Sequence, residues 1–568
     1  MNRNVLPFAL VLFLSLVIIT TSCDQLSHPR DEKKVQIKEE NIDAATSLQI
    51  EELLQKIIAD SSKVDDSSRL NYLELAAHFY ASNNNSNLWS EQKKWIPLAD
   101  TMLTFIEKSA AYGLFKDDYH FTALSRLRSW LSTDSVAMKN STHWAKADIL
   151  FTDAGFHLIK DLHFGRLLND SLLRQDSSTS FKFLINTLAQ LINTKQWQST
   201  LAGIEPRHQG YQQLKAAIPQ FLDSMDHKTY TYVTYPFKKG DEKDSLQFVK
   251  TLQQRLFESN SIGYTNPLPD SAKLDSAIRV YQKKKGLKQD GLVTTSLIKL
   301  MNNSDEEKFK RIAISLDRYK LLRDTMPKQY IWVNLPAYYL ELRNADTVAL
   351  YSKIICGAPS TRTPLLVSKI YNMITYPTWT VPTSIIAKQY LPKLKQNSNY
   401  LAKLGLKLVN NKGEKVDPSA VSWNKYSKGI PYQVMQASGD NNALGVMKFN
   451  FANEHAVYLH DTNQRYLFQK SARALSHGCV RVQEWEKLAY YLVRNDSMNL
   501  AVGDTMRFNV DSVKNWLSAK KHRGINLRTQ IPLYITYYGC EGKEGKIKFY
   551  EDIYGEDKAL REKYFSTK

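Results

Sequence analysis

Cysteine is scarce in this sequence, and metal-binding patterns are missing. The 568 residues include four cysteines, and the spacings of cysteine and histidine do not suit a zinc site. We therefore expect no metal and no cofactor. Internal repeats and low-complexity tracts are also absent, so nothing indicates a repeat architecture. The four cysteines are Cys23, Cys356, Cys479 and Cys540.

Acidic residues are outnumbered by basic ones. With 76 Lys and Arg against 57 Asp and Glu, the formal net charge is +19. A basic balance suits an anionic partner such as nucleic acid, a membrane surface or a cell wall. Because no nucleic-acid-binding motif accompanies the charge, we expect no nucleic-acid partner. The excess is either directed toward a cell wall or an ordinary solvated surface.

The chain has no hydrophobic run long enough for a comfortable membrane span. The apolar run at residues 5–19 follows Arg3 and covers about 15 residues, fewer than a spanning helix needs. A short positive region followed by such a run is typical of a targeting segment, which is not part of the fold. We therefore interpret residues 1–22 as a signal peptide.

The end of this segment resembles a lipoprotein cleavage site. Residues 20–23 read Thr-Thr-Ser-Cys, which would make Cys23 the lipidated first residue of the mature chain. Thr20 stands where such sites usually carry Leu, so ordinary signal cleavage and an uncleaved anchor stay open. Residues 23–45 are polar and charged, as expected of a linker. The predicted location is periplasmic, on a bacterial envelope membrane through the lipid anchor.

The most informative segment is the hexapeptide at residues 476–481, Ser-His-Gly-Cys-Val-Arg. A cysteine becomes a good nucleophile when a base or a positive field favours its thiolate, and a histidine distant in sequence can supply that base. His460 precedes the hexapeptide and ends a predicted strand. Gly478 allows a tight turn and close approach of a substrate. The alternative is a buried, inert cysteine beside a structural turn.

A helix is predicted after Cys479. Apolar residues recur there at helical spacing, and Glu484 and Glu486 suit a helix start. Cys479 would then lie on a loop just before the helix, where the positive end of the dipole favours a thiolate. The apolar positions are Val482, Trp485, Leu488, Ala489, Leu492 and Val493.

The hexapeptide together with His460 resembles the active-site signature of the L,D-transpeptidases, which cross-link bacterial peptidoglycan through a cysteine acyl-enzyme. The resemblance covers most of residues 40–560 and is closest to the large periplasmic, multidomain branch of that family. Further segments that carry it are residues 330–343, 376–382, 441–449, 532–538 and 552–555.

Carried onto this chain, the resemblance implies Cys479 as the nucleophile and His460 as its proton acceptor and donor. Backbone donors around Gly478 would bind the oxyanion. Arg481 would hold a substrate carboxylate or brace the loop, and His477 could equally be a structural histidine. The substrate-binding and oxyanion residues would be Ser476, His477, Gly478 and Arg481. The remaining thiols, Cys356 and Cys540, would either pair in an oxidising compartment or stay free and buried.

The chain is too long for one ordinary core, so several domains are expected. The predicted class is α+β and multidomain, with a helical scaffold, a small three-helix peptidoglycan-binding-like bundle and a β-rich catalytic domain. A basic, helix-prone capping insertion would cover the catalytic site. The expected ranges are 46–235 for the scaffold, 236–303 for the bundle, 304–511 for the catalytic domain with the insertion at about 383–431, and 512–568 for an extension packed on the scaffold.

The bundle is predicted from the segment at residues 277–293. Ile278 and Tyr281 give an apolar helix face, Gly286 stops the helix, and Asp290 with Gly291 forms a turn before another helix. The segment resembles peptidoglycan-binding modules, which either bind the wall or only position the enzyme.

The resemblance therefore predicts a peptidoglycan L,D-transpeptidase that forms 3→3 cross-links between stem peptides. Its partners would be peptidoglycan stem peptides and glycan, and the membrane through the lipid anchor. One alternative uses water as the acceptor, which gives an L,D-carboxypeptidase or endopeptidase. Another is a non-catalytic wall-binding lipoprotein, against which the intact His460 and Cys479 argue. A papain-like protease is disfavoured because its cysteine signature is absent.

Overall fold

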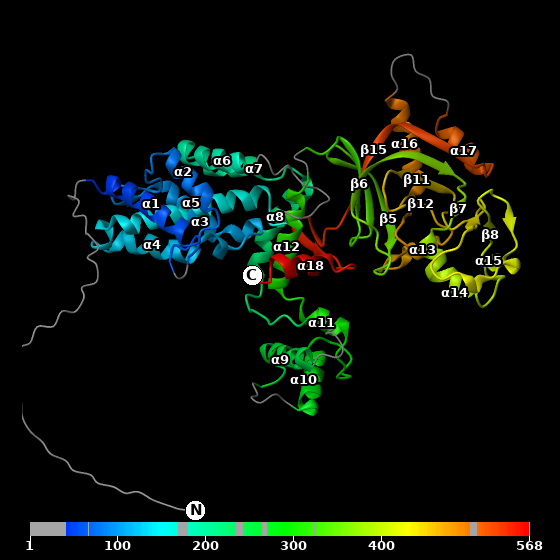
Figure 1. Ribbon diagram of the computed structural model, residues 1–568, viewed down its shortest axis with the longest axis horizontal. Coiled ribbons are helices and arrows are strands. Elements are labelled where there is room, and N and C mark those ends of the chain that lie inside the picture. Colours follow the sequence, from blue (N-terminus) through cyan, green and yellow to red (C-terminus); the bar gives the residue numbers. More distant parts are fainter. Residues whose placement is uncertain are drawn as a thin grey trace, which may run out of the picture.

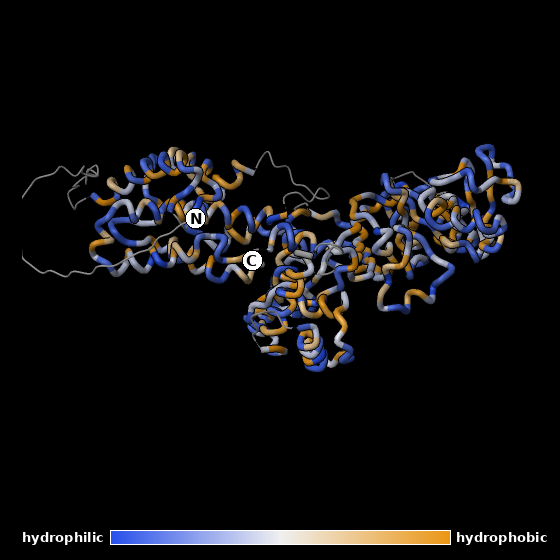
Figure 2. Tube along the Cα trace, turned by 60° about the horizontal axis from the view of Figure 1, so that its bottom comes forward, coloured by the Kyte–Doolittle hydropathy of each residue, from blue (hydrophilic) through white to orange (hydrophobic). Residues whose placement is uncertain are grey.

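The computed structural model describes residues 41–65, 68–167, 180–234, 242–263, 270–322, 325–499 and 508–566. Within these ranges, no helix combines the length and hydrophobicity of a membrane span. Hydrophobic and hydrophilic residues alternate along the described chain (Figure 2). The predicted signal peptide and Cys23 lie outside the described residues. The molecule is elongated, with helices at one end and a β-rich region at the other (Figure 1).

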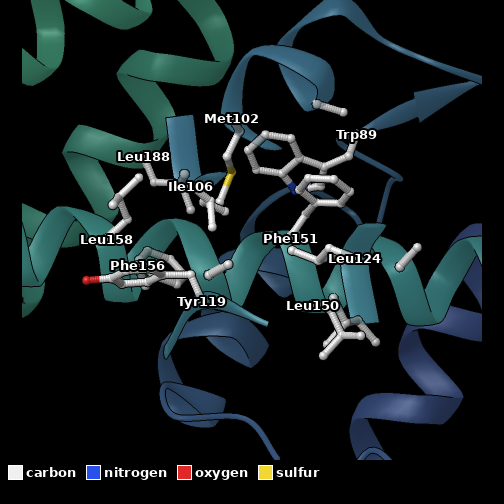
Figure 3. Packing of buried hydrophobic residues seen from close by; sticks show 14 of the residues in the cluster. Trp89, Met102, Ile106, Tyr119, Leu124, Leu150, Phe151, Phe156, Leu158 and Leu188 are labelled. Atoms are coloured by element: carbon white, nitrogen blue, oxygen red, sulfur yellow. The ribbon is translucent and has the colours of Figure 1, made fainter. Parts of the chain in front are cut away.

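The N-terminal region is helical, as predicted, and is built around α5 (Ser141–His163). This helix buries residues on all sides because its neighbours surround it. Trp89 stacks on Phe151 at 5.4 Å, and Met102 and Leu188 pack nearby (Figure 3). The other helices are α1 (Ile42–Ala59), α2 (Leu73–Ser82), α3 (Pro97–Glu107), α4 (Phe121–Thr133), α6 (Ser180–Thr194), α7 (Trp197–Ile204) and α8 (Gln209–Asp223).

Helix α1 begins at Ile42, inside the range predicted to be a linker. Asn41 caps it, because its side chain accepts a hydrogen bond from the amide of Ala44 at 3.1 Å. The predicted linker boundary at residue 45 is therefore too late. Buried residues such as Ala45 and Ile50 tie the first turns of α1 to the helical core.

Three short helices follow and share a small core. They are α9 (Glu242–Glu258), α10 (Ser271–Lys284) and α11 (Thr295–Met301). Tyr281 is buried in this core, and Gly286 and Gly291 both adopt positive φ, as their positions after the helix and in the turn require. The interpretation of this segment as a peptidoglycan-binding-like module stays a prediction. The core consists of Val233, Leu252, Leu256, Ala277, Ile278, Tyr281, Leu297, Ile298 and Met301.

Helix α12 (Asp305–Lys320) joins the helical region to the C-terminal helix. The prediction instead placed α12 in the catalytic domain, which was expected to start at residue 304. Its Arg318 binds Asp557 at 2.6 Å, and its Glu307 binds Arg561 at 2.7 Å. Both partners, Asp557 and Arg561, belong to α18 (Glu556–Tyr564). The β-rich region therefore begins with β3 rather than with α12.

The β-rich region is one sheet that closes on itself. Its strand order is β13-β5-β14-β12-β11-β6-β15-β3-β4, and β4 also pairs with β5. Closure leaves the ring without an open edge, and α16 (Trp485–Met498) and α17 (Val510–Ser518) pack against it. The strands are β3 (Gln329–Asn334), β4 (Tyr339–Asn344), β5 (Thr347–Gly357), β6 (Leu366–Thr375), β11 (Met447–Phe451), β12 (Leu459–His460), β13 (Ala474–Ser476), β14 (Val480–Val482) and β15 (Arg523–Thr536).

The predicted C-terminal extension is divided between the β-rich sheet and the helices α8 and α12. Strand β15 pairs with both β6 and β3, so it is an integral strand of the sheet and not an extension. The hairpin of β16 (Cys540–Lys543) and β17 (Lys546–Phe549) packs on α8. A Cβ on Gly542 would lie 2.1 Å from the carbonyl oxygen of Gln213, so only glycine fits this contact.

The capping insertion is a small mixed α/β unit, although the sequence indicated helices. Its four-stranded sheet has the order β7-β10-β8-β9. A separate core that includes Val381, Leu394 and Val434 holds it together. The elements are β7 (Trp379–Thr380), α13 (Thr383–Ile385), the π-helical turn η5 (Ile386–Tyr390), α14 (Leu391–Leu394), α15 (Tyr400–Lys403), β8 (Leu406–Val409), β9 (Lys415–Val416) and β10 (Gln433–Gln436). It lies at the end of the molecule away from the helical region (Figure 1).

Candidate active site

The sheet brings His460 and Cys479 together on one face. Strands β12 and β14 are parallel neighbours, with Leu459 opposite Val480 and His460 opposite Arg481. The amide of Val480 donates to the carbonyl of Tyr458 at 3.1 Å. Because side chains alternate along a strand, Tyr458 and His460 share a face with Cys479 and Arg481. The pairing of strands, which the sequence could not show, creates this site.

The strand that carries His460 is anchored by the residue after it. The Asp461 amide donates to the carbonyl of Met447 at 2.9 Å, and its carboxylate accepts from the amide of Val446 at 3.0 Å and from Arg465 at 2.7 Å. A Cβ on Gly445 would lie 2.2 Å from this carboxylate. These contacts fix the backbone of His460.

The signature loop is held by its own hydrogen bonds. The Ser476 hydroxyl donates to the carbonyl of Cys479 at 2.5 Å and accepts from the amide of Gly478 at 3.2 Å. Gly478 has a φ of +119°, which other residues rarely adopt. Ser476 therefore braces the turn, and the Gly478 amide, predicted as an oxyanion donor, is engaged inside the loop.

A second loop, which contains Thr361 and Thr363, supports the signature loop through hydrogen bonds. The Thr361 hydroxyl donates to the carbonyl of Ser476 at 2.9 Å, and the Thr363 hydroxyl donates to that of Gly478 at 2.8 Å. The Tyr554 hydroxyl accepts from the Thr363 amide at 3.1 Å and donates to the carbonyl of Gly357 at 2.7 Å. Sequence reasoning did not assign these residues, although Tyr554 belongs to one of the segments that carry the resemblance.

The thiol of Cys479 is hydrogen-bonded by Tyr458. Burial raises the pKa of Cys479, and hydrogen bonds from the amide and hydroxyl of Tyr458 and the charges of Lys448 and Arg481 oppose the rise. The pKa of Tyr458 is also raised, mainly by burial and then by Cys479, while a hydrogen bond from Trp379 lowers it. Tyr458 was not among the predicted site residues, and only its place two residues before His460 marks it in the sequence.

His460 is a buried, neutral imidazole. Its side chain lies on the sheet face, and 4% of the residue is exposed. The centroid of its ring lies 5.6 Å from that of the Tyr458 ring. Burial and the charges of Arg481 and Lys448 lower the pKa of His460 to about 3. Nδ1 finds no hydrogen-bond partner within the described residues. His460 is thus unprotonated at neutral pH.

The helix that follows the signature does not act on Cys479 as predicted. The predicted helix is present as α16, but it starts at Trp485, and β14 lies between it and Cys479. Val482 belongs to this strand and not to the helix. Positive charge at the thiol comes instead from the side chains of Lys448 and Arg481.

His477 is exposed, and partial burial together with the charge of Arg481 lowers its pKa. Its Nε2 is hydrogen-bonded to the side-chain amide of Gln389, which belongs to η5 of the capping insertion. The structure therefore places Cys479, His460 and Arg481 together on the sheet face, whereas His477 faces the insertion.

The other described cysteines, Cys356 and Cys540, are buried and free, so they do not form the disulfide left open by the sequence. Burial raises the pKa of Cys356 to about 11 and that of Cys540 to about 12. Neither is a candidate nucleophile. In the described part of the chain, no three His, Cys, Asp or Glu side chains are grouped to hold a metal ion.

Comparisons with known proteins match two regions of the chain. Residues 74–218 match the model of a scaffold domain, and residues 328–504 match that of the L,D-transpeptidase catalytic domain. A Haemophilus influenzae protein named "Putative L,D-transpeptidase" is 34% identical over 251 residues, which cover 44% of this chain and 49% of that protein. The chain thus spans about half the length of this curated relative.

Solved structures of L,D-transpeptidases also match. The ertapenem-acylated catalytic domain from E. faecium is 14% identical, with a TM-score of 0.16, and the match covers 37% of this chain and 99% of that one. An Enterococcus faecium enzyme with a cysteine-to-serine substitution is 13% identical, with a TM-score of 0.16, and covers 41% and 64% of the two chains.

Proposed function

Because this chain contains an L,D-transpeptidase catalytic domain behind an N-terminal scaffold domain, we propose that it forms 3→3 cross-links between peptidoglycan stem peptides. The observation that supports the proposal is the placement of Cys479 and His460 on one sheet face, together with the raised pKa of the Cys479 thiol and the lowered pKa of His460. A neutral base on the same sheet face as a thiol fits nucleophilic acyl transfer.

In the proposed first half-reaction, Cys479 attacks the carbonyl between the L-centre of a diamino acid and D-Ala in a stem tetrapeptide. Its proton passes to His460, a sulfur–carbon bond forms, and the carbon–nitrogen bond to D-Ala breaks. His460 then returns the proton to the departing amine. The product is a thioester on Cys479.

In the second half-reaction, the side-chain amine of another stem attacks the thioester. An amide bond forms, the sulfur–carbon bond breaks, and the thiol recovers a proton through His460. No cofactor is needed for either step. Backbone donors at Cys479 would stabilise the oxyanion, since the Gly478 amide is already bound to Ser476.

Arg481 is proposed to hold a carboxylate of the donor peptide. Its Nη1 donates to Gln464 at 3.1 Å, while its buried Nε has no hydrogen-bond partner in the described residues. A guanidinium suits this role because its donors match the two oxygens of a carboxylate.

Hydrolysis of the same thioester is the second candidate. An L,D-carboxypeptidase or endopeptidase would use the same Cys479 and His460, with water in place of the amine. The contact between Gln389 and His477 favours transfer, because it places the capping insertion beside the site, where it can exclude water. A periplasmic site of action, with a lipid on Cys23 and wall contact through α9–α11, completes the proposal.

The deciding experiment incubates the purified enzyme with disaccharide tetrapeptide muropeptides and analyses the products by mass spectrometry. A cross-linked dimer with loss of one D-Ala is the expected product. Tripeptide alone would support the hydrolase. No product from either route, with a folded enzyme, would favour a non-catalytic wall-binding protein.

A further inference from the structure

Three residues form a row across neighbouring strands beside Cys479. Lys448 on β11 lies opposite His460 on β12, and His460 lies opposite Arg481 on β14. Directly paired residues of neighbouring strands project from the same face of a sheet. The row therefore places one cation on each side of the imidazole, on the face that holds the nucleophile.

Neither cation is neutralised by the described part of the protein. No carboxylate is among the groups that act on Lys448 or Arg481 there. Asp461, which directly follows His460, binds Arg465 instead, at 2.7 Å, and Glu484 binds Lys487 at 2.9 Å. The ammonium of Lys448 lies 4.0 Å from the centroid of the Tyr458 ring.

Both cations are partly withdrawn from water. Lys448 and Arg481 are each of intermediate exposure, and the Arg481 Nε is fully buried. Partly buried charge without a counter-ion is unfavourable, and an arriving anion relieves the cost. Two such cations around one nucleophile form a site that an anionic substrate completes.

We propose that Lys448, together with Arg481, binds a free carboxylate of the acyl donor next to the scissile amide. Lys448 thereby makes the enzyme select donors with a carboxylate there over donors with a carboxamide. The inference rests on the proposed acyl transfer and adds its substrate selectivity and the residue that sets it. Lys448 lies outside the signature, so its role depends on the strand register.

Two parts of the donor could supply the carboxylate. One is the C-terminal carboxylate of the departing D-Ala, and the other is the second carboxylate of the diamino acid. Both have the same charge and geometry. Three synthetic tetrapeptide donors distinguish them: the free acid, the C-terminal amide, and the peptide with a carboxamide on the diamino acid.

The experiment compares kcat/KM for acylation by these donors in the wild type, Lys448→Met, Lys448→Arg and Lys369→Met. Lys369 is an exposed lysine on β6, so its replacement removes the same charge away from the site. A charge-assisted hydrogen bond corresponds to about 10- to 100-fold. The wild type should disfavour one of the two amides by that factor.

Lys448→Met should lower kcat/KM for the free-acid donor by about the same factor. It should change kcat/KM for the disfavoured amide donor by less than roughly 3-fold. Lys448→Arg should keep most of the selectivity, and Lys369→Met should keep all of it. Because the charge of Lys448 also opposes the rise in the pKa of Cys479, alkylation of Cys479 by neutral iodoacetamide measures this general effect on the thiol, and each donor rate is divided by it. Equal use of all three donors by the wild type would overturn the inference, as would equal slowing of acid and amide in Lys448→Met.

Failure of the proposed function would be seen separately, as no acylation of the wild type by any peptide. The inference would then be judged with a carbapenem against its methyl ester, which differ by one carboxylate, using intact-mass acylation rates. A preference for the acid that Lys448→Met removes would support it. Equal rates for acid and ester would contradict it.

Discussion

His477 in the signature loop is hydrogen-bonded to Gln389 in the capping insertion. The same insertion begins with β7, whose Trp379 lowers the pKa of Tyr458, and Tyr458 in turn opposes the rise in the pKa of the Cys479 thiol. The insertion thus contacts the site at two points, one on the exposed rim and one next to the nucleophile. A shift of the capping insertion would therefore change the surroundings of the Cys479 thiol.

The identity of the nucleophile is tested by Cys479→Ser. We expect a folded protein that no longer forms an acyl-enzyme, because a serine hydroxyl is a far poorer nucleophile beside the same base. A carbapenem should add covalently to the wild type and to the control Cys356→Ser, whose thiol is buried. Intact-mass spectrometry is the measurement. An adduct on Cys356 or Cys540 of the Cys479→Ser protein would show that the assignment is wrong.

The two histidines should differ in effect. His460→Ala removes a buried base on the face of Cys479 and should slow acylation by roughly 10²–10⁴-fold. His477→Ala removes an exposed side chain whose partner is Gln389, so it should cost far less. Single-turnover acylation measures both, with circular dichroism to check folding. Comparable losses in the two variants would contradict a single base at His460.

The pH dependence follows from the two pKa shifts. The lowered pKa of His460, about 3, keeps its imidazole neutral above that pH, and the raised pKa of Cys479 keeps its thiol protonated at neutral pH. The rate of iodoacetamide alkylation should therefore rise with pH through and beyond about 8.5, the ordinary value for cysteine. A resting thiolate–imidazolium pair would instead give a plateau across pH 6–8, and observing one would refute the neutral pair.

The candidate nucleophile and base could be predicted from the sequence because the hexapeptide and His460 form a local pattern. Lys448 and Tyr458 could not, since their contacts with Cys479 depend on which strands are neighbours. The register that pairs Lys448 with His460 joins segments that are apart in the chain. The helix after Cys479 was predicted correctly, but its assumed effect on the thiol was wrong because β14 intervenes.

The fold shows the same division. The helical character of the N-terminal region was predicted, and it is confirmed. Strand β15 reaches its place between β6 and β3 only through long-range pairing, so the sequence analysis assigned these residues to an extension and not to the sheet. The sheet of the capping insertion consists of strands of two to four residues, too short for a periodic signal.

We expect the capping insertion to determine whether an amine or water attacks the thioester. Strands β7 and β10 pair directly, with Thr380 opposite Met435, so residues 383–431 can be replaced by a short Gly-Ser linker across neighbouring ends. The wild type should yield mainly cross-linked dimer, and the replacement should lower the dimer-to-tripeptide ratio by about 10-fold, because water then reaches the thioester. Acylation by a small carbapenem should fall less than cross-linking.

A matched variant separates shielding from charge. Lys388→Gln with Lys393→Gln removes exposed charge from the insertion and keeps its fold, so it should slow acylation by an acidic stem peptide at low salt and leave the product ratio unchanged. Both quantities come from liquid chromatography with mass spectrometry. If the replaced insertion gave the wild-type ratio, the insertion would have no role in the choice of acceptor, and water would have to be excluded by the sheet face around Cys479 alone.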